Sequence, residues 1–351
     1  MSGQHKMISL STPSSDKPIA IWLLICCVLI FAMVVLGGVT RLTRSGLSIV
    51  EWDPIMGAVP PLTQTRWEET FDKYKQTPEY IKVNQGMSLD EFKGIFYVEW
   101  AHRLLGRLIG AVFLIPFLYF LVRQRITREL APKLIVMFVL GGLQGALGWY
   151  MVKSGLVDIP RVSPYRLTAH LAFAVVIYAY MFWTALGLLY PPGAPRLTPR
   201  GLVRFGVAVT ALIFLMILSG GFVAGNKAGF AFNTFPWMNG RFIPEGMYAM
   251  QPLWSNLFEN IATVQFNHRL LAYLLCLVIP VFWWQTMRVA SPARARRAVH
   301  FLLGWLAVQV LLGIATLLYV VPVPLAAAHQ AGALVLFSLA LTVQYSLRTP
   351  H

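Results

Sequence analysis

The segment Ile19–Val39, with the sequence IAIWLLICCVLIFAMVVLGGV, decides the fold, because it contains no charged side chain. A helix needs about 20 apolar residues to cross the hydrocarbon core of a bilayer. The segment is too long for the apolar region of a secretory signal, and it lacks a clear small-x-small cleavage site. It therefore predicts a membrane-spanning helix and no cleaved signal.

The composition of the whole chain agrees with a membrane protein. Of its 351 residues, 57% are hydrophobic and only 12% are charged, whereas about a quarter of the residues of a soluble domain are charged. We predict an all-α polytopic membrane protein with eight transmembrane helices. The expected spans are residues 19–40, 97–122, 131–152, 165–190, 202–225, 261–287, 298–320 and 324–347.

The formal charge of +15 is concentrated in the short gaps between these spans. Cytoplasmic loops carry such an excess of lysine and arginine, so the charge indicates topology and not nucleic-acid binding. An even number of spans puts both termini in the cytoplasm, with residues 1–18 as a tail and 191–201 as a linker. The two long connections, 41–96 and 226–260, then face the outer side. The basic clusters are Arg123, Arg125, Arg128 and Lys133; Arg196, Arg200 and Arg204; and Arg288, Arg294, Arg296 and Arg297.

Each outer connection has a sequence pattern of its own. Thr65-x-x-Glu68 and Ser88-x-x-Glu91 both have the pattern of a helix capping box, which predicts short surface helices in the first connection. The second connection is rich in aromatic residues, which are typical of an interfacial belt and also suit a lid over a lipophilic ligand. Both interpretations stay open. The aromatic residues are Phe230, Phe235, Trp237, Phe242, Tyr248, Trp254 and Phe258.

Five short motifs of the first half of the chain recur in the same order in the second half. Such a repeat implies two structural units, and four spans in each unit give both the same orientation in the membrane. We predict two pseudo-symmetric four-helix bundles, residues 19–190 and 202–347. The matched motifs are Gly37-Gly38 with Gly220-Gly221, Gly46-Leu47 with Gly229-Phe230, His102-Arg103-Leu104-Leu105 with His268-Arg269-Leu270-Leu271, Gln144 and Leu147-Gly148 with Gln309 and Leu312-Gly313, and Ala169-His170 with Ala328-His329.

Four histidines lie inside predicted spans at repeat-equivalent positions: His102, His170, His268 and His329. Their spans all run inward from the outer side, so we expect the four imidazoles at similar depth in the outer half of the bilayer. Ionisable side chains inside a membrane are costly and usually functional. One histidine from each of two helices in a bundle suits a haem with two axial imidazoles. We predict two haem-ligating pairs; a non-haem metal site, a proton relay and a transport role are the other interpretations.

The two histidine pairs have different neighbours. Glu99 lies three residues before the first histidine of its pair, whereas Gln265 takes the equivalent place in the second half. A glutamine cannot carry charge or take up a proton, so only the first half has a group for acid–base or electrostatic work there; a salt bridge to an arginine is the other interpretation of Glu99. Arg103 and Arg269 directly follow the histidines, where they suit contacts with haem propionates or an extension to the membrane interface.

Three motifs resemble those of the haem A synthase family, and the resemblance extends over all eight expected spans. One is similar to the first-loop motif of that family, one to its Glu-x-x-His-Arg motif and one to its third outer-loop signature. The motifs are Gly37–Ser48 (GGVTRLTRSGLS) continued by Trp52 and Pro54, Glu99-Trp-Ala-His102-Arg103, and Asn233-Thr-Phe-Pro236 with Met238 and Gly240.

The resemblance implies oxidation of a ring methyl group of haem O to a formyl group, which gives haem A for terminal oxidases. It also implies that His102 and His170 bind the substrate haem, with Glu99 as the catalytic carboxylate, and that His268 and His329 bind a resident haem b. The main alternative is a non-catalytic, quinol-linked electron carrier with two b-type haems. A transporter with parallel repeats is a further alternative.

Some members of that family carry cysteine pairs in the outer loops, and this chain departs from them. Its three cysteines, Cys26, Cys27 and Cys276, all lie in apolar runs. The cysteine-free form resembles the proteobacterial and mitochondrial branch. No mitochondrial transit peptide is evident, so we expect a bacterial inner membrane, with the haem sites toward the periplasm. The expected partners are haem O and the lipid bilayer, together with haem O synthase, an electron donor, oxidase assembly factors and a second copy of the chain.

Overall fold

The computed structural model describes residues 16–51, 56–155, 162–191 and 198–348. These residues form no strands, and eight of their helices are long and apolar enough to cross a membrane. The chain is a multi-pass membrane protein, and the predicted all-α class with eight spans is confirmed. The spanning helices are α1 (Lys17–Leu42), α4 (Leu89–Val122), α5 (Ala131–Gly155), α6 (Pro164–Leu189), α7 (Arg200–Gly225), α8 (Ile261–Arg288), α9 (Ala293–Leu318) and α10 (Val323–Arg348). Trp52, Pro54, Arg196, most of the predicted tail 1–18 and most of the predicted linker 191–201 lie outside the described residues.

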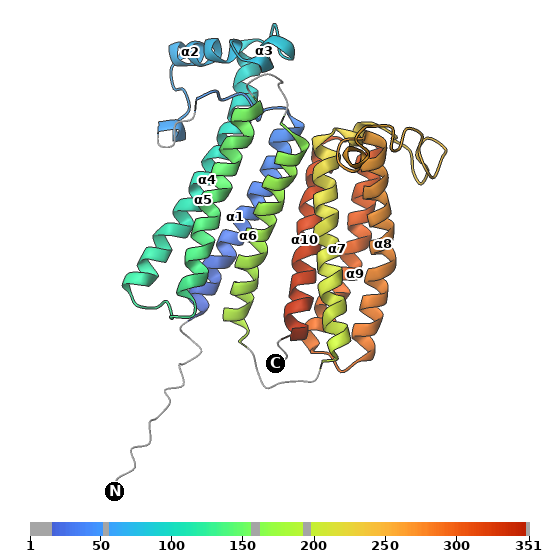
Figure 1. Ribbon diagram of the computed structural model, residues 1–351. Coiled ribbons are helices and arrows are strands. Elements are labelled where there is room, and N and C mark those ends of the chain that lie inside the picture. Colours follow the sequence, from blue (N-terminus) through green and yellow to red (C-terminus); the bar gives the residue numbers. More distant parts are fainter. Residues whose placement is uncertain (1–15, 52–55, 156–161, 192–197, 349–351) are drawn as a thin grey trace.

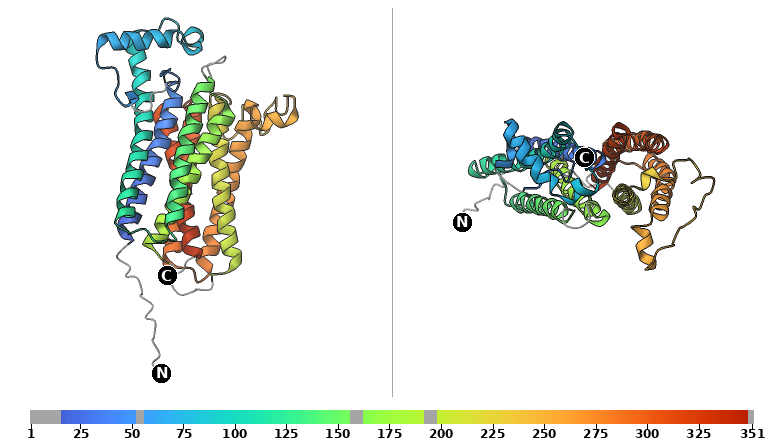
Figure 2. Two further views of the ribbon diagram at one scale, coloured as in Figure 1. Left: turned by 60° about the vertical axis from the view of Figure 1, so that its left-hand side comes forward. Right: turned by 90° about the horizontal axis from the view of Figure 1, so that it is seen from above.

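The spanning helices stand in two groups of four (Figure 1). In the first group α1 packs against α4 and α6, and α5 packs against the same two helices. In the second group α7 packs against α8 and α10, and α9 packs against the same two helices. The groups meet where α1 contacts α10 and where α6 contacts α7 and α10, and the view from above shows them side by side (Figure 2). This arrangement is compatible with the predicted pair of pseudo-symmetric bundles.

Glycines bring the two groups close together. A Cβ atom on Gly225, the last residue of α7, would lie 2.7 Å from the Cα atom of Pro164 at the start of α6. A Cβ atom on Gly221, one turn earlier, would lie 2.9 Å from Oγ1 of Thr168. Carbon atoms attract one another best at about 3.5–4.0 Å, so a methyl group at either position would overlap its neighbour. The approach of α6 to α7 therefore requires glycine.

The first outer connection forms α2 (Gln64–Lys75), α3 (Pro78–Lys82) and a short turn, η1 (Met56–Ala58), above the first group of helices (Figure 1). Ser88 and Glu91 form the predicted capping box. Because this box starts the helix, α4 begins at Leu89, well before residue 97, where the span was expected to start. The second outer connection contains the short turns η2 (Ala228–Phe230) and η3 (Leu253–Leu257).

The capping box predicted at Thr65 and Glu68 is wrong. The cap of α2 is Thr63, whose side chain accepts a hydrogen bond from the N–H of Arg66, so Thr65 already lies inside the helix. Burial decides this start, because α2 packs an apolar face on the outer end of α4. The buried cluster consists of Trp67, Phe71, Tyr74, Phe92 and Phe96.

Glu79 of α3 is a buried carboxyl group influenced by basic residues of both outer connections. It is 5% exposed, and its Oε2 atom has no hydrogen-bond partner. Burial raises the pKa of this carboxyl group, and the positive charges of Arg44 and Lys227 oppose the shift. Arg44 and Lys227 take equivalent places in the repeat, two residues before the matched Gly46-Leu47 and Gly229-Phe230 motifs. Glu79 therefore links the outer ends of the two groups electrostatically.

Replacement of Gly225 by alanine is expected to destabilise the protein, because the added methyl group overlaps the backbone of Pro164 and forces α6 and α7 apart. The expected loss is about 1–3 kcal/mol of unfolding free energy, measured as a lower midpoint of heat unfolding in detergent. Gly141→Ala in α5 is the matched control, since a Cβ atom there meets nothing within 4 Å and alanine favours a helix over glycine. An unchanged midpoint for Gly225→Ala would contradict the packing role.

Candidate functional site

In the first group of helices, two histidines each lie against a glycine of a neighbouring helix. A Cβ atom on Gly37 of α1 would lie 3.1 Å from Cε1 of His102 on α4. A Cβ atom on Gly148 of α5 would lie 3.0 Å from Cε1 of His170 on α6. The missing side chains thus make room for both imidazoles inside the group.

The second group repeats these contacts at equivalent positions. A Cβ atom on Gly220 of α7 would lie 3.4 Å from Cε1 of His268 on α8, and one on Gly313 of α9 would lie 2.9 Å from Cε1 of His329 on α10. All four glycines belong to the motifs that repeat in the sequence. The repeated glycine motifs therefore mark the positions where a histidine side chain packs against the backbone of a neighbouring helix.

The rings of His268 and His329 lie close together in an edge-on arrangement. Their centroids are 6.5 Å apart, and their planes make an angle of 77°. An iron atom bound by two imidazoles, with metal–nitrogen bonds of about 2 Å, holds the ring centroids about 6 Å apart. The spacing is compatible with two axial ligands of one haem iron, and the ligand assignment of this pair stays a prediction.

Hydrogen bonds to the imidazoles differ between the two pairs. In the second group, Ser219 Oγ lies 3.1 Å from Nδ1 of His268, and Gln309 Nε2 lies 3.1 Å from Nδ1 of His329. The amide nitrogen of Gln309 can only donate, so Nδ1 of His329 accepts, and the proton of the neutral ring lies on Nε2. The hydroxyl of Ser219 can accept from Nδ1 of His268, which leaves Nε2 of that ring for a metal. In the first group, the Nδ1 atoms of His102 and His170 are buried without a hydrogen-bond partner. The first pair has one contact at the other ring nitrogen, because Gln144 Nε2 lies 3.5 Å from Nε2 of His170. Polar neighbours therefore contact both rings of the second pair and one ring of the first.

The carboxylate of Glu99 on α4 is buried, 3% exposed, and hydrogen-bonded on both oxygens. Oε1 accepts from Nε and NH2 of Arg103 at 3.1 and 2.7 Å. Oε2 accepts from the N–H of Ser48, the hydroxyl of Ser48 and the N–H of Ile49 at 2.7, 2.7 and 2.9 Å. The salt bridge that the sequence left open is present, and the first outer connection supplies the remaining donors.

Gln265 on α8 has the same place in the second group and the opposite hydrogen-bonding role toward its outer connection. Its Nε2 atom donates to the carbonyl oxygens of Ala228 and Ala231 at 2.8 and 2.5 Å. Its Oε1 atom accepts from NH2 of Arg269 at 3.2 Å, as Glu99 accepts from Arg103. Thus Glu99 accepts hydrogen bonds from its connection, whereas Gln265 donates them.

The two arginines hold the outer connections in equivalent ways. NH2 of Arg103 donates to the carbonyl of Ile49 at 2.9 Å, and NH2 of Arg269 donates to the carbonyl of Phe232 at 2.7 Å. Ile49 and Phe232 lie three residues after Gly46 and Gly229, the first residues of matched motifs. Nε of Arg269 is buried with no hydrogen-bond partner. Each arginine therefore bridges a histidine-bearing helix and the connection above it.

Sequence reasoning did not assign a role to three polar residues of these sites. Ser48 was part of the first-loop motif, and Gln309 was part of the repeat, but neither motif shows what the side chain contacts. Ser219 carried one signal, its place directly before the repeated Gly220. The equivalent residue before Gly37 is Leu36, which has no hydroxyl group to offer.

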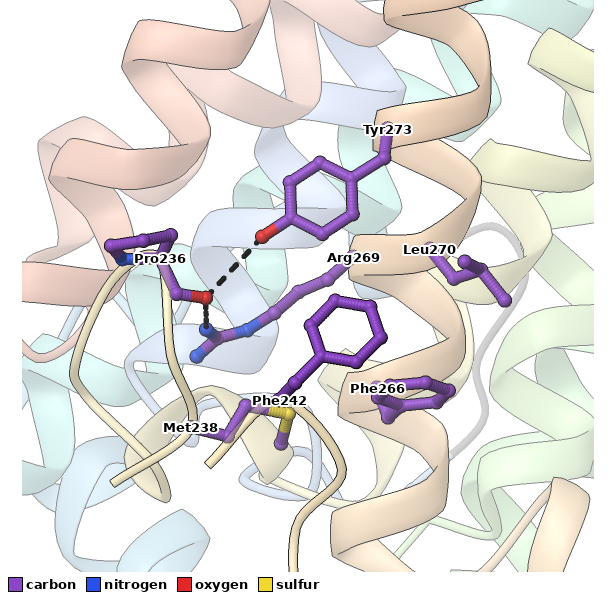
Figure 3. A pocket seen from close by; sticks show the side chains of 7 residues that line it. All are labelled: Pro236, Met238, Phe242, Phe266, Arg269, Leu270 and Tyr273. Carbon is purple, nitrogen blue, oxygen red and sulfur yellow. Dashed lines mark hydrogen bonds between the residues drawn. The ribbon is translucent and has the colours of Figure 1, made fainter. Parts of the chain in front are cut away.

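The second outer connection folds over the outer part of α8. The hydroxyl of Tyr273 and NH1 of Arg269 both donate to the carbonyl of Pro236, at 3.3 and 3.4 Å, beside a small pocket (Figure 3). Farther along the connection, Tyr248 and Trp254 are 54% and 58% exposed. The part of the connection that covers α8 is compatible with a lid, and the part with exposed aromatic residues is compatible with an interfacial belt. Both interpretations stay predictions. The pocket is lined by Pro236, Met238, Phe242, Phe266, Arg269, Leu270 and Tyr273.

Known proteins resemble this chain over nearly its full length. A family model described as "Cytochrome oxidase assembly protein" matches residues 20–341. The proteins named "Heme A synthase" in Nitrosospira multiformis and Nitrosomonas eutropha are 59% and 56% identical to it; each match covers 95% of this chain, and 94% and 97% of the relatives. "Heme A synthase COX15" of Arabidopsis thaliana is 47% identical over 98% of this chain and 78% of the relative. The chain belongs to the haem A synthase family.

Proposed function

We propose that this protein oxidises a ring methyl group of haem O to a formyl group and so makes haem A for terminal oxidases. Relatives named "Heme A synthase" support this activity, at 52–59% identity over nearly the full chain. The proposal rests on one chemical difference between two otherwise matching sites. Glu99 places a carboxylate beside Arg103, whereas Gln265 places an amide beside Arg269. An electron carrier does not require a carboxylate at only one of its two haems.

Residues 19–190 form the substrate half, in which His102 and His170 bind haem O. Residues 202–347 form the other half, in which His268 and His329 bind a resident haem b. Polar neighbours at both rings of the second pair, against one ring of the first, support this division, because oriented imidazoles favour tight binding of a permanent group. When bound there, haem b would supply electron transfer to the substrate site.

Glu99 acts on the substrate through its charge. Five N–H or O–H groups donate to its carboxylate and hold it in place. A negative charge held there stabilises positive charge that develops at the ring methyl group during its oxidation.

Arg103 and Arg269 contact the propionates of the two haems. Their guanidinium groups already lie beside the histidine-bearing helices, and a guanidinium binds a carboxylate through two parallel hydrogen bonds. In the structure NH2 of each arginine donates to a loop carbonyl. A propionate therefore has to share or replace that carbonyl, which couples haem binding to the outer connection.

The protein resides in the inner membrane of a bacterium, with both termini in the cytoplasm and the histidine pairs toward the periplasm. Both long connections lie at one end of the helices, opposite the start of α1 and the end of α10, which supports this orientation (Figure 1). The activity implies haem O synthase as the source of substrate, an electron donor, and oxidase assembly factors that receive the product. A second copy of the chain is a further proposed partner.

The parental protein, expressed with a source of haem O, is expected to yield haem A in the extracted haems, and Glu99→Gln is expected to lower that yield at least tenfold. The glutamine keeps the size of the side chain and removes the negative charge. Asp90→Asn, on the exposed first turn of the same helix, is the control and should match the parental yield. Full yield from Glu99→Gln would remove Glu99 from the mechanism. No haem A from the parental protein would favour the electron-carrier alternative.

Replacement of His268 or His329 by alanine is expected to remove the tightly bound haem b, because one imidazole cannot complete the axial pair. The measurement is the haem content per chain of the purified protein, from its absorption spectrum and extracted haems. His300→Ala is the matched control, since His300 accepts a hydrogen bond from Trp283 at the far end of α8 and α9. Normal haem b content in both variants would refute the ligand assignment.

A further inference from the structure

Ser48 makes more hydrogen bonds to Glu99 than any other residue of the first outer connection. Both its N–H and its hydroxyl lie 2.7 Å from Oε2, and Ile49 adds one N–H at 2.9 Å. Ser48 is only 1% exposed, so water does not readily replace its hydroxyl. The hydroxyl is also 3.4 Å from the carbonyl of Ile95, one turn before Glu99. Ser48 therefore fixes the carboxylate from the side opposite Arg103.

The repeat shows what is special about this serine. Ser48 lies two residues after Gly46, and Ala231 lies two residues after the matching Gly229. Ala231 offers no hydroxyl, and its carbonyl instead accepts from Gln265. The serine thus occurs beside the carboxylate and is absent beside the amide, although the backbone–arginine contact is the same in both halves.

We propose that Ser48 is the positioning residue of Glu99, an inference that rests on the proposed function. Arg103 holds Oε1 along the helix, and Ser48 holds Oε2 toward the outer connection, so together they fix the plane of the carboxylate. Loss of the hydroxyl leaves Oε2 with two backbone donors. The charge then has more freedom to move away from the position where it acts on the substrate.

Ser48→Ala is expected to lower the rate of haem A formation at saturating haem O about tenfold, the effect of one charge-assisted hydrogen bond expressed in the transition state. The KM for haem O and the haem b content should stay at the parental values, because Ser48 contacts neither histidine pair in the structure. Ser45→Ala is the matched control, since Ser45 is equally buried in the same connection but bonds Thr40 and Thr43. It should keep the parental rate.

An infrared comparison tests the contact without reference to activity. In purified protein, Ser48→Ala should shift a carboxylate stretching band, because that oxygen loses a donor. The same substitution in a Glu99→Gln background should leave this band region unchanged, and so should Ser45→Ala in the parental background. A purely structural serine would give the same spectral change with or without the carboxylate.

The outcomes separate the inference from the function on which it rests. Haem A from the parental protein, together with the parental rate and an unshifted band in Ser48→Ala, would overturn the positioning role and leave the proposed function standing. Equal losses of rate in Ser48→Ala and Ser45→Ala would assign the effect to the loop as a whole and also overturn it. A parental protein without haem A would instead defeat the proposed function, while a shifted band would still support the contact.

Discussion

An imidazole fits into the middle of a four-helix group only where a neighbouring helix backbone has no side chain in its way. His102, His170 and His329 meet that constraint through a glycine on a neighbouring helix of their own group, whereas a Cβ atom on Gly220 would make an ordinary contact with His268. Glycine destabilises a helix interior by about 0.8–1.0 kcal/mol relative to alanine, so such positions are costly. Space for the rings explains why glycine occurs there. The absence of a side chain at Gly221 and Gly225 likewise lets the two groups of helices approach each other.

Around this shared frame, the two halves differ in the direction of a few hydrogen bonds. The arginine that follows each histidine donates to an equivalent loop carbonyl, so the outer connections dock in the same way. Glu99 faces three donors from Ser48 and Ile49, whereas Gln265 faces two acceptors, the carbonyls of Ala228 and Ala231. Neither loop would suit the other side chain. The exchange of glutamate for glutamine is therefore matched by a different loop conformation in each half, which presents donors to Glu99 and acceptors to Gln265.

The sequence predicted the number of spans correctly, because the length of an apolar run can be read from neighbouring residues. The structure is compatible with the grouping that the repeat predicted, and the role of the four histidines stays a prediction. The box at Ser88 and Glu91 was correct for the same reason, since the whole motif is local. Thr65 was wrong because the start of α2 depends on which aromatic residues pack on α4, a contact made far along the chain.

Ser48 and Ser219 show the same limit at the candidate sites. Ser48 lies 51 residues before the carboxylate that it contacts, and Ser219 lies 49 residues before His268. A repeat marks equivalent positions, but it does not tell which polar side chains reach across from a loop or a neighbouring helix.

In the proposed assignment, the exchange of Glu99 for Gln265 also changes how strongly the neighbouring arginine attracts an anion. Arg103 already pairs with Glu99, so it attracts a propionate less strongly than an arginine without a carboxylate partner. Gln265 leaves the charge of Arg269 uncancelled, and Arg269 is only 9% exposed, where attraction is weakly screened by water. With that assignment, an anionic haem would be held more strongly in the second half, as a resident group requires, and more weakly in the first, as a substrate that must leave as product requires.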